Sequence, residues 1–246
     1  MSAFAVWAVL ALVAQVPGAT PEASEFLSAY SAERDGLETL QARFVQWTYT
    51  PEEDIQSEGT VTFVRPKRII FRYDDPPLSY MIDGTHAYEY DEELEQILIY
   101  NIEGQPEAEA FFMGMESDID AIKDAYQINV LPPDDALDGA HAVRLTPHPN
   151  DDMEPLFEYV TLQMRKQDFL PTQILIRNDE NSRVEYTLTN FQKNTTLAAD
   201  ESQILVKEDA DIVVNDVALD TAGEDGHLFP DADVLEEYNE RFPDNE

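Results

Sequence analysis

Histidines and carboxylates are the residue types best suited to chemistry in this chain of 246 residues, which has no cysteine. The four histidines are scattered, and no two of them form an H-x-x-x-H pair that would bind a metal. G-x-S-x-G, P-loop and G-x-G-x-x-G segments are also missing. We therefore expect no enzyme activity, no catalytic residue, no metal site and no cofactor. The histidines are His86, His141, His148 and His227.

Paired acids offer two other kinds of chemistry. Asp74-Asp75, Asp134-Asp135 and Asp151-Asp152 carry the oxygen ligands that calcium prefers, but none has the spacing of an EF-hand loop. We interpret them as solvated acidic loops. Carboxylates are so numerous that no glycosidase-like pair stands out. A secreted hydrolase with an unrecognised carboxylate pair stays open as the less favoured alternative.

The charge excludes further classes of partner. The chain has 51 acidic and 15 basic residues, for a formal net charge of -36. Binding to nucleic acid needs clustered lysine and arginine, so no nucleic-acid partner is expected. Hydrated carboxylates keep a protein soluble at high salt, which favours a salt-adapted protein over an acidic protein without a special habitat.

The N-terminus has the pattern of a secretory signal. Ala3 to Val16 is apolar except for Gln15 and is too short to span a bilayer. We expect residues 1–20 to be a signal peptide cleaved near Gly18 to Thr20, with a buried N-terminal helix as the alternative. The absence of cysteine excludes an acylated N-terminal anchor, so an exported, soluble protein is expected.

Apolar spacing then predicts a mainly β protein of the α+β class. Residues 21 to 44 have helical spacing, and residues 106 to 125 form a second helical segment within a series of roughly eleven strands. Alternating residues predict an apolar sheet face that lines either a hydrophobic cavity or an ordinary core. The expected cavity residues are Val45, Trp47, Val61, Phe63, Ile69, Phe71, Tyr80 and Tyr88 on strands, with Phe111 and Phe112 from the helical segment.

The composition changes after residue 215. Residues 216 to 246 contain 11 acids and one base, which predicts an acidic, partly disordered extension outside the core. Its removal near Asp216 is expected to leave the fold and ligand binding intact. The alternative is a short helix that docks on the sheet through Val234, Leu235, Tyr238 and Phe242.

An ordered set of short motifs resembles a known family. R-F-V-Q at 43–46 precedes S-E-G-T-V-T-F-V-R-P at 57–66 and I-I-F-R-Y at 69–73. I-D-G at 82–84 and Y-E-Y-D at 88–91 follow, and F-Q-K-N at 191–194 with I-L-V at 204–206 is similar to the closing segment of the family. In order and spacing the set resembles the periplasmic outer-membrane lipoprotein carriers of the LolA family.

The resemblance implies a fold and a function. The fold would be an unclosed antiparallel β-barrel over residues 21–215, with helices lidding its concave face. The function would be to bind the acyl chains of lipoproteins in an apolar cavity and move them from the inner to the outer membrane. Implied partners are acylated lipoproteins, an inner-membrane lipoprotein-releasing transporter and an outer-membrane acceptor lipoprotein. The protein itself is expected to be a monomer. The alternative is a cavity protein of the same fold that binds another lipid or senses envelope stress.

The family also implies a role for one arginine. Arg65, in the Arg-Pro pair that ends residues 57–66, matches the arginine linked to holding the lid shut through hydrogen bonds to lid backbone. A guanidinium has five donors and can hold several carbonyls at once. The alternative is a strand-end arginine in solvent.

Overall fold

The computed structural model describes residues 21–103, 112, 115, 119–131, 141–149, 157–215, 217–219 and 227–241. The expected signal peptide and Phe111 lie outside these residues. No helix within them is both long and apolar enough to cross a bilayer.

One helix and a run of six strands come first among the described residues. They are α1 (Pro21–Asp35), β1 (Thr39–Tyr49), β2 (Asp54–Val64), β3 (Arg68–Tyr73), β4 (Leu78–Ile82), β5 (His86–Asp91) and β6 (Gln96–Asn101). The remaining elements are α2 (Ile119–Ala125), β7 (Tyr126–Leu131), β8 (His141–Pro147), β9 (Tyr159–Met164), β10 (Pro171–Arg177), β11 (Arg183–Lys193), α3 (Ala199–Ser202), β12 (Ile204–Val206), β13 (Asp211–Val214), β14 (Val217–Ala218), β15 (His227–Phe229) and α4 (Ala232–Arg241).

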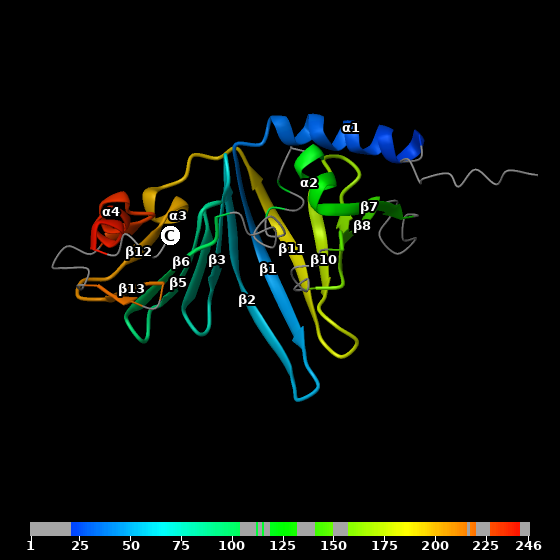
Figure 1. The fold of residues 1–246 in the computed structure, drawn as a ribbon. Coiled ribbons are helices and arrows are strands. Elements are labelled where there is room, and N and C mark those ends of the chain that lie inside the picture. The colour runs from blue at the N-terminus through cyan, green and yellow to red at the C-terminus, as the bar shows by residue number, and fades with distance from the viewer. Residues whose placement is uncertain are drawn as a thin grey trace, which may run out of the picture.

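A large sheet dominates the molecule. Thirteen strands pair in the order β14-β13-β6-β5-β4-β3-β2-β1-β11-β10-β9-β8-β7, and the two end strands do not pair with each other (Figure 1). The prediction of a mainly β, unclosed sheet is therefore confirmed. Two details differ: the strands outnumber the eleven expected, and the sheet is mixed because β13 runs parallel to β6.

The first strand begins earlier than the helical spacing suggested. Residues up to Phe44 were expected to be helical, but α1 ends at Asp35 and β1 begins at Thr39. Leu40, Ala42 and Phe44 are buried while the residues between them are only half-buried. This alternation of period two is the signature of a strand, and it competed with helical spacing at the same residues.

The register divides the sheet into two faces. Phe44 lies beside Leu188, and Phe63 pairs with Ile69, whereas Ile70 pairs with Met81, which in turn pairs with Tyr88. Successive side chains of a strand point to opposite faces. We call the face that carries Phe44, Phe63 and Ile69 the inner face, and the face that carries Ile70, Met81 and Tyr88 the outer face.

Each face is covered over a different part of the sheet. On the inner face, Phe112, Met115 and Leu170 join the core over the central strands. Further along the same face, α1 and α2 cover β8 to β10, with α1 lying across one end of the strands (Figure 1). The helices contribute Phe26, Leu27, Tyr30, Ile119, Ile122 and Ala125 to this contact.

The outer face is covered by the C-terminal residues, contrary to expectation. Phe229 is fully buried and Tyr238 is 3% exposed, and both join the core that contains Met81, Tyr88 and Ile99. β15 pairs with β12 in a separate two-stranded sheet. The expectation that residues after 215 lie outside the core therefore does not hold for residues 227–241. The alternative, a helix docked on the sheet, matches α4, where Val234 and Leu235 also pack against this core, while Phe242 lies outside the described residues. A few well-spaced apolar residues are enough to attach this segment to the sheet, because the outer face of β4 to β6 is itself apolar.

Candidate ligand-binding face

Five aromatic rings cluster on the inner face. The ring of Phe44 on β1 lies 5.8 Å from Phe71, 5.1 Å from Tyr73 and 5.9 Å from Tyr186, measured between centroids. Tyr73 also lies 5.7 Å from Tyr80 on β4. Phe44 is buried, while the other four rings are only partly buried. We call these five residues the aromatic cluster.

A glycine makes room for this cluster. Gly59 on β2 pairs with Phe44. A Cβ atom at residue 59 would lie 1.9 Å from the Arg72 carbonyl oxygen and 2.8 Å from Cζ of Phe44. These distances are too short for any side chain, so only glycine lets the Phe44 ring occupy this place.

The hydroxyl groups of the cluster stay uncharged. Tyr73 donates a hydrogen bond to Oε1 of Gln46 at 2.6 Å. Burial raises the pKa of Tyr73 and of Tyr186, and it raises the pKa of Tyr80 to about 12, with Glu89 contributing. The cluster is therefore neutral at physiological pH, which suits the binding of an apolar ligand.

Several of the expected cavity residues share the inner face. Val61, Phe63, Ile69 and Phe112 are buried there, and Phe71 packs against them. Tyr80 pairs with Phe71 and so points to the same side. The structure thus brings together the residues expected from β2, β3 and β4.

Three expected residues lie on the outer face instead. Val45 and Trp47 alternate with the inner-face residues of β1, and Trp47 is 37% exposed beside Tyr49. Tyr88 pairs with Met81 and belongs to the outer core. The placement of Val45, Trp47 and Tyr88 in the cavity is therefore corrected. Alternation shows which residues of one strand share a face, but not which face of the sheet that is. A shift of the pairing register by one residue moves all side chains of a strand to the other face, and the sequence pattern does not fix that register.

Sequence reasoning missed three members of the cluster. Phe44 was assigned to the end of a helix, and Tyr73 and Tyr186 were not selected, although both lie in alternating runs. Val184, Tyr186 and Leu188 alternate along β11, which was the available signal.

Arg65 holds the end of α1. Its Nε donates to the Leu37 carbonyl at 2.9 Å, and its Nη2 donates to the Arg34 carbonyl at 2.5 Å. Its side chain also lies 3.8 Å from the Glu38 carboxylate. The last carbonyls of a helix lack partners within the helix, and a cation there also interacts favourably with the helix dipole. Arg65 thus fixes the connection between α1 and β1.

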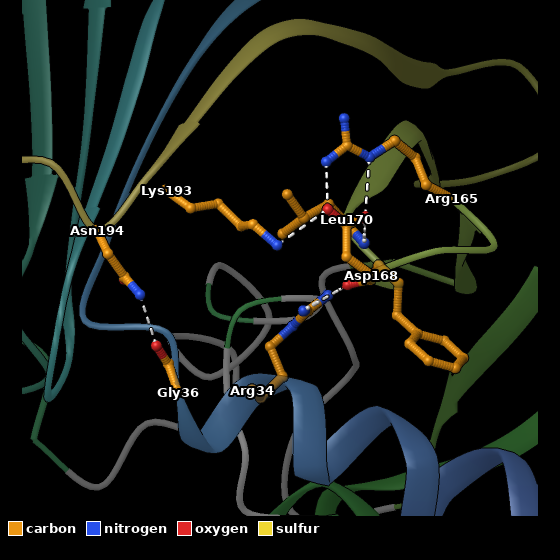
Figure 2. Close-up of polar contacts among 8 residues, drawn as sticks. Arg34, Gly36, Arg165, Asp168, Leu170, Lys193 and Asn194 are labelled. Carbon is orange, nitrogen blue, oxygen red and sulfur yellow. Dashed lines mark hydrogen bonds and ion pairs between the residues drawn. The ribbon is translucent and has the colours of Figure 1, made fainter.

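A second set of contacts holds the same end of α1 (Figure 2). Arg34, only 1% exposed, donates to the carbonyls of Asp168 at 3.0 Å and Phe169 at 2.5 Å. The Asp168 carboxylate binds Arg165 and, at 3.2 Å, Lys193. Burial alone would raise the pKa of Asp168, but hydrogen bonds from Arg165 and Lys193 outweigh it and lower the pKa. These contacts join the turn between β9 and β10 to the end of α1.

The family model of the outer membrane lipoprotein carrier protein LolA matches residues 35–204. This match covers more than half of the chain. The protein belongs to the LolA family. None of the curated proteins compared with the chain matches it.

Among solved structures, one shows the same kind of fold at low sequence identity. A conserved protein of unknown function from Thermus thermophilus superposes with a TM-score of 0.52 and 11% identity, over 79% of this chain and 99% of that one. A lipoprotein-sorting protein domain from Vibrio parahaemolyticus gives 0.43 and 10%, over 72% and 94% of the two chains. MucB of Pseudomonas aeruginosa, in its complex with MucA, gives 0.40 and 16%, over 74% and 60%.

The LolA match and the structure end at different residues. The family model stops at residue 204, whereas β12, β15 and α4 continue the fold to Arg241 on the outer face.

Within the described ranges, no three histidines or acids come close enough together to hold a metal ion.

Proposed function

We propose that this member of the LolA family is a periplasmic carrier, not an enzyme, that holds the acyl chains of lipoproteins against the aromatic cluster. The observation that carries the proposal is this neutral, partly exposed group of rings on the inner face. Burial of each CH2 group stabilises by about 0.8 kcal/mol, so acyl chains cross water only when an apolar surface covers them. The implied partners are an inner-membrane releasing transporter and an outer-membrane acceptor lipoprotein.

The ligand itself offers the direct test. We expect mass spectra of the protein purified from its own envelope to contain acylated peptides or intact lipoproteins. Free lipid alone would instead support the alternative, a cavity protein of the same fold with another cargo. A spectrum without any acylated species would reject the carrier.

We further propose that α1 is the lid and that Arg65 keeps it closed. Hydrogen bonds to a charged group contribute about 1.5–3 kcal/mol each, and we expect the lower end because the Arg65 side chain is 26% exposed. Loss of both bonds would then cost about 3 kcal/mol, roughly a hundredfold shift towards an open lid. Arg65→Leu should therefore retain an acylated peptide longer and transfer it more slowly to an acceptor.

Two further variants separate this effect from a loss of charge. Arg65→Lys should restore transfer only in part, because an ammonium group lacks the planar fork that reaches two carbonyls. Arg43→Leu removes the same charge from an exposed ion pair with Asp74 and should transfer at the wild-type rate. A fluorescence assay measures transfer of the acylated peptide, and a thermal melt establishes that each variant is folded. If folded Arg65→Leu also transfers the peptide at the wild-type rate, Arg65 is not a lid residue.

A further inference from the structure

A groove of about 670 Å³ opens on the outer face, away from the aromatic cluster. One wall comes from the main sheet, where Ser79 on β4 pairs with Tyr90 on β5. The other wall is formed by residues 204 to 208, which include all of β12. The volume lies within the range of pockets that bind ligands in other proteins.

The edge of β12 that faces this groove has no strand beside it. β12 pairs with β15 in a two-stranded sheet, and no third strand joins that sheet among the described residues. The Gln203 carbonyl accepts a hydrogen bond from Arg72 at 2.9 Å, and the Lys207 amide donates to Tyr90 at 3.1 Å. Both partners belong to the main sheet. Because strand residues alternate, the backbone of Leu205 between them also faces this side.

Exposed leucines accompany this edge of β12. Leu205 is 54% exposed and lines the groove. Leu94 is 70% exposed and lies in the turn between β5 and β6, between the groove residues Glu92 and Glu95. Edge strands with exposed apolar side chains are the surfaces to which proteins add an extended segment.

The charges of the groove select the partner. Four carboxylates line it, from Glu92, Glu95, Asp200 and Glu208, against two cations. Both cations are already engaged, because Arg72 donates to the carbonyls of residues 200, 201 and 203, and Lys207 lies 3.4 Å from the Glu92 carboxylate. A basic partner would therefore find complementary charge here, and the net charge of -36 would speed its approach.

We propose that this groove binds an extended segment of a partner polypeptide, with alternating basic and aliphatic side chains, which adds to β12 as a third strand. The backbone of Leu205 pairs with the segment, the aliphatic side chains contact Leu205 and Leu94, and the basic ones face the carboxylates. The site lies on the opposite face from the aromatic cluster, so it does not depend on the carrier function.

Fluorescence anisotropy of the full-length protein with a labelled peptide of alternating lysine and valine tests the proposal. We expect binding that weakens as salt rises, and none with a peptide in which glutamate replaces lysine. The lysine peptide with alternate amides N-methylated should also fail to bind, because it cannot pair with a strand edge. Equal binding of either comparison peptide, or no binding of the lysine peptide, would overturn the proposal.

Charge-reversal variants locate the site. Glu95→Lys combined with Glu208→Lys should weaken binding at least about tenfold. Glu52→Lys combined with Glu180→Lys makes the same change of charge in the β1–β2 and β10–β11 turns and should change binding less than about twofold. Hydrogen exchange should slow at the Leu205 amide when the peptide binds. Equal weakening by both double variants, or unchanged exchange at β12, would place the peptide elsewhere.

Discussion

Phe229→Ala is expected to lower the free energy of unfolding by about 3–5 kcal/mol, the usual cost of truncating a buried phenylalanine. Phe229 is fully buried between the outer face and α4, and its ring lies 6.2 Å from that of Tyr88. Since most domains are stable by only about 5–15 kcal/mol, this single change should remove a large part of the total. Urea denaturation followed by circular dichroism measures the loss.

The matched control is Leu94→Ala, which removes an exposed side chain near the same strands and should change stability by less than about 0.5 kcal/mol. A chain that ends at residue 215 should be less stable still, because Tyr88, Ile97 and Ile99 would lose part of their cover. If Phe229→Ala and the shortened chain melt like the full protein, residues 227–241 contribute nothing to the core.

Much of this fold follows from local patterns. The alternation in residues 60–64, 68–73 and 96–102 predicts three strands, because a strand that is buried on one side repeats every two residues. β3 and β6 lie at the expected residues to within one position, whereas β2 begins six residues earlier, at Asp54. Asp83-Gly84 is a dipeptide typical of tight hairpin turns, and it lies between β4 and β5. The order and spacing of short motifs within these strands and turns resembled those of the LolA family.

Long-range choices could not be predicted in this way. Trp47 and Phe71 have equally apolar surroundings in the sequence, yet the register places them on opposite faces. The pairing of β13 with β6 joins segments more than a hundred residues apart. The cover over the outer face was missed because a segment with 11 acids looks solvated, although only the side that carries Phe229 and Tyr238 needs to be apolar.

The end of α1 illustrates both cases. The contact of Arg65 with helix backbone was implied by the family resemblance, and the structure shows hydrogen bonds from Arg65 to the carbonyls of Arg34 and Leu37. The burial of Arg34 against the Asp168 and Phe169 carbonyls left no signal in the sequence, because the partners are 134 and 135 residues away.

Phe71→Glu is expected to weaken binding of an acylated peptide at least about a hundredfold. Phe71 lies within the aromatic cluster, 5.8 Å from Phe44 and 5.9 Å from Tyr186. An acyl chain placed against the cluster would have to share that apolar surface with an unpaired carboxylate, which costs several kcal/mol. Phe71→Ala should weaken binding less, and it preserves the test if Phe71→Glu does not fold.

The matched control comes from the opposite face. Trp47 was expected from the sequence to line the same cavity, but it lies on the outer face and is 37% exposed. Trp47→Glu introduces the same charge on a neighbouring part of the sheet. It should therefore leave binding within about twofold of the wild type, because an exposed charge is solvated.

The most direct test is a fluorescence titration of the wild type and these three variants with a tripalmitoylated cysteine peptide, beside thermal melts that establish folding. We expect tight binding by the wild type and by Trp47→Glu, strongly reduced binding by folded Phe71→Glu, and a smaller reduction by folded Phe71→Ala. Full binding by both folded Phe71 variants, or loss of binding by folded Trp47→Glu, would contradict a carrier that holds acyl chains on the inner face.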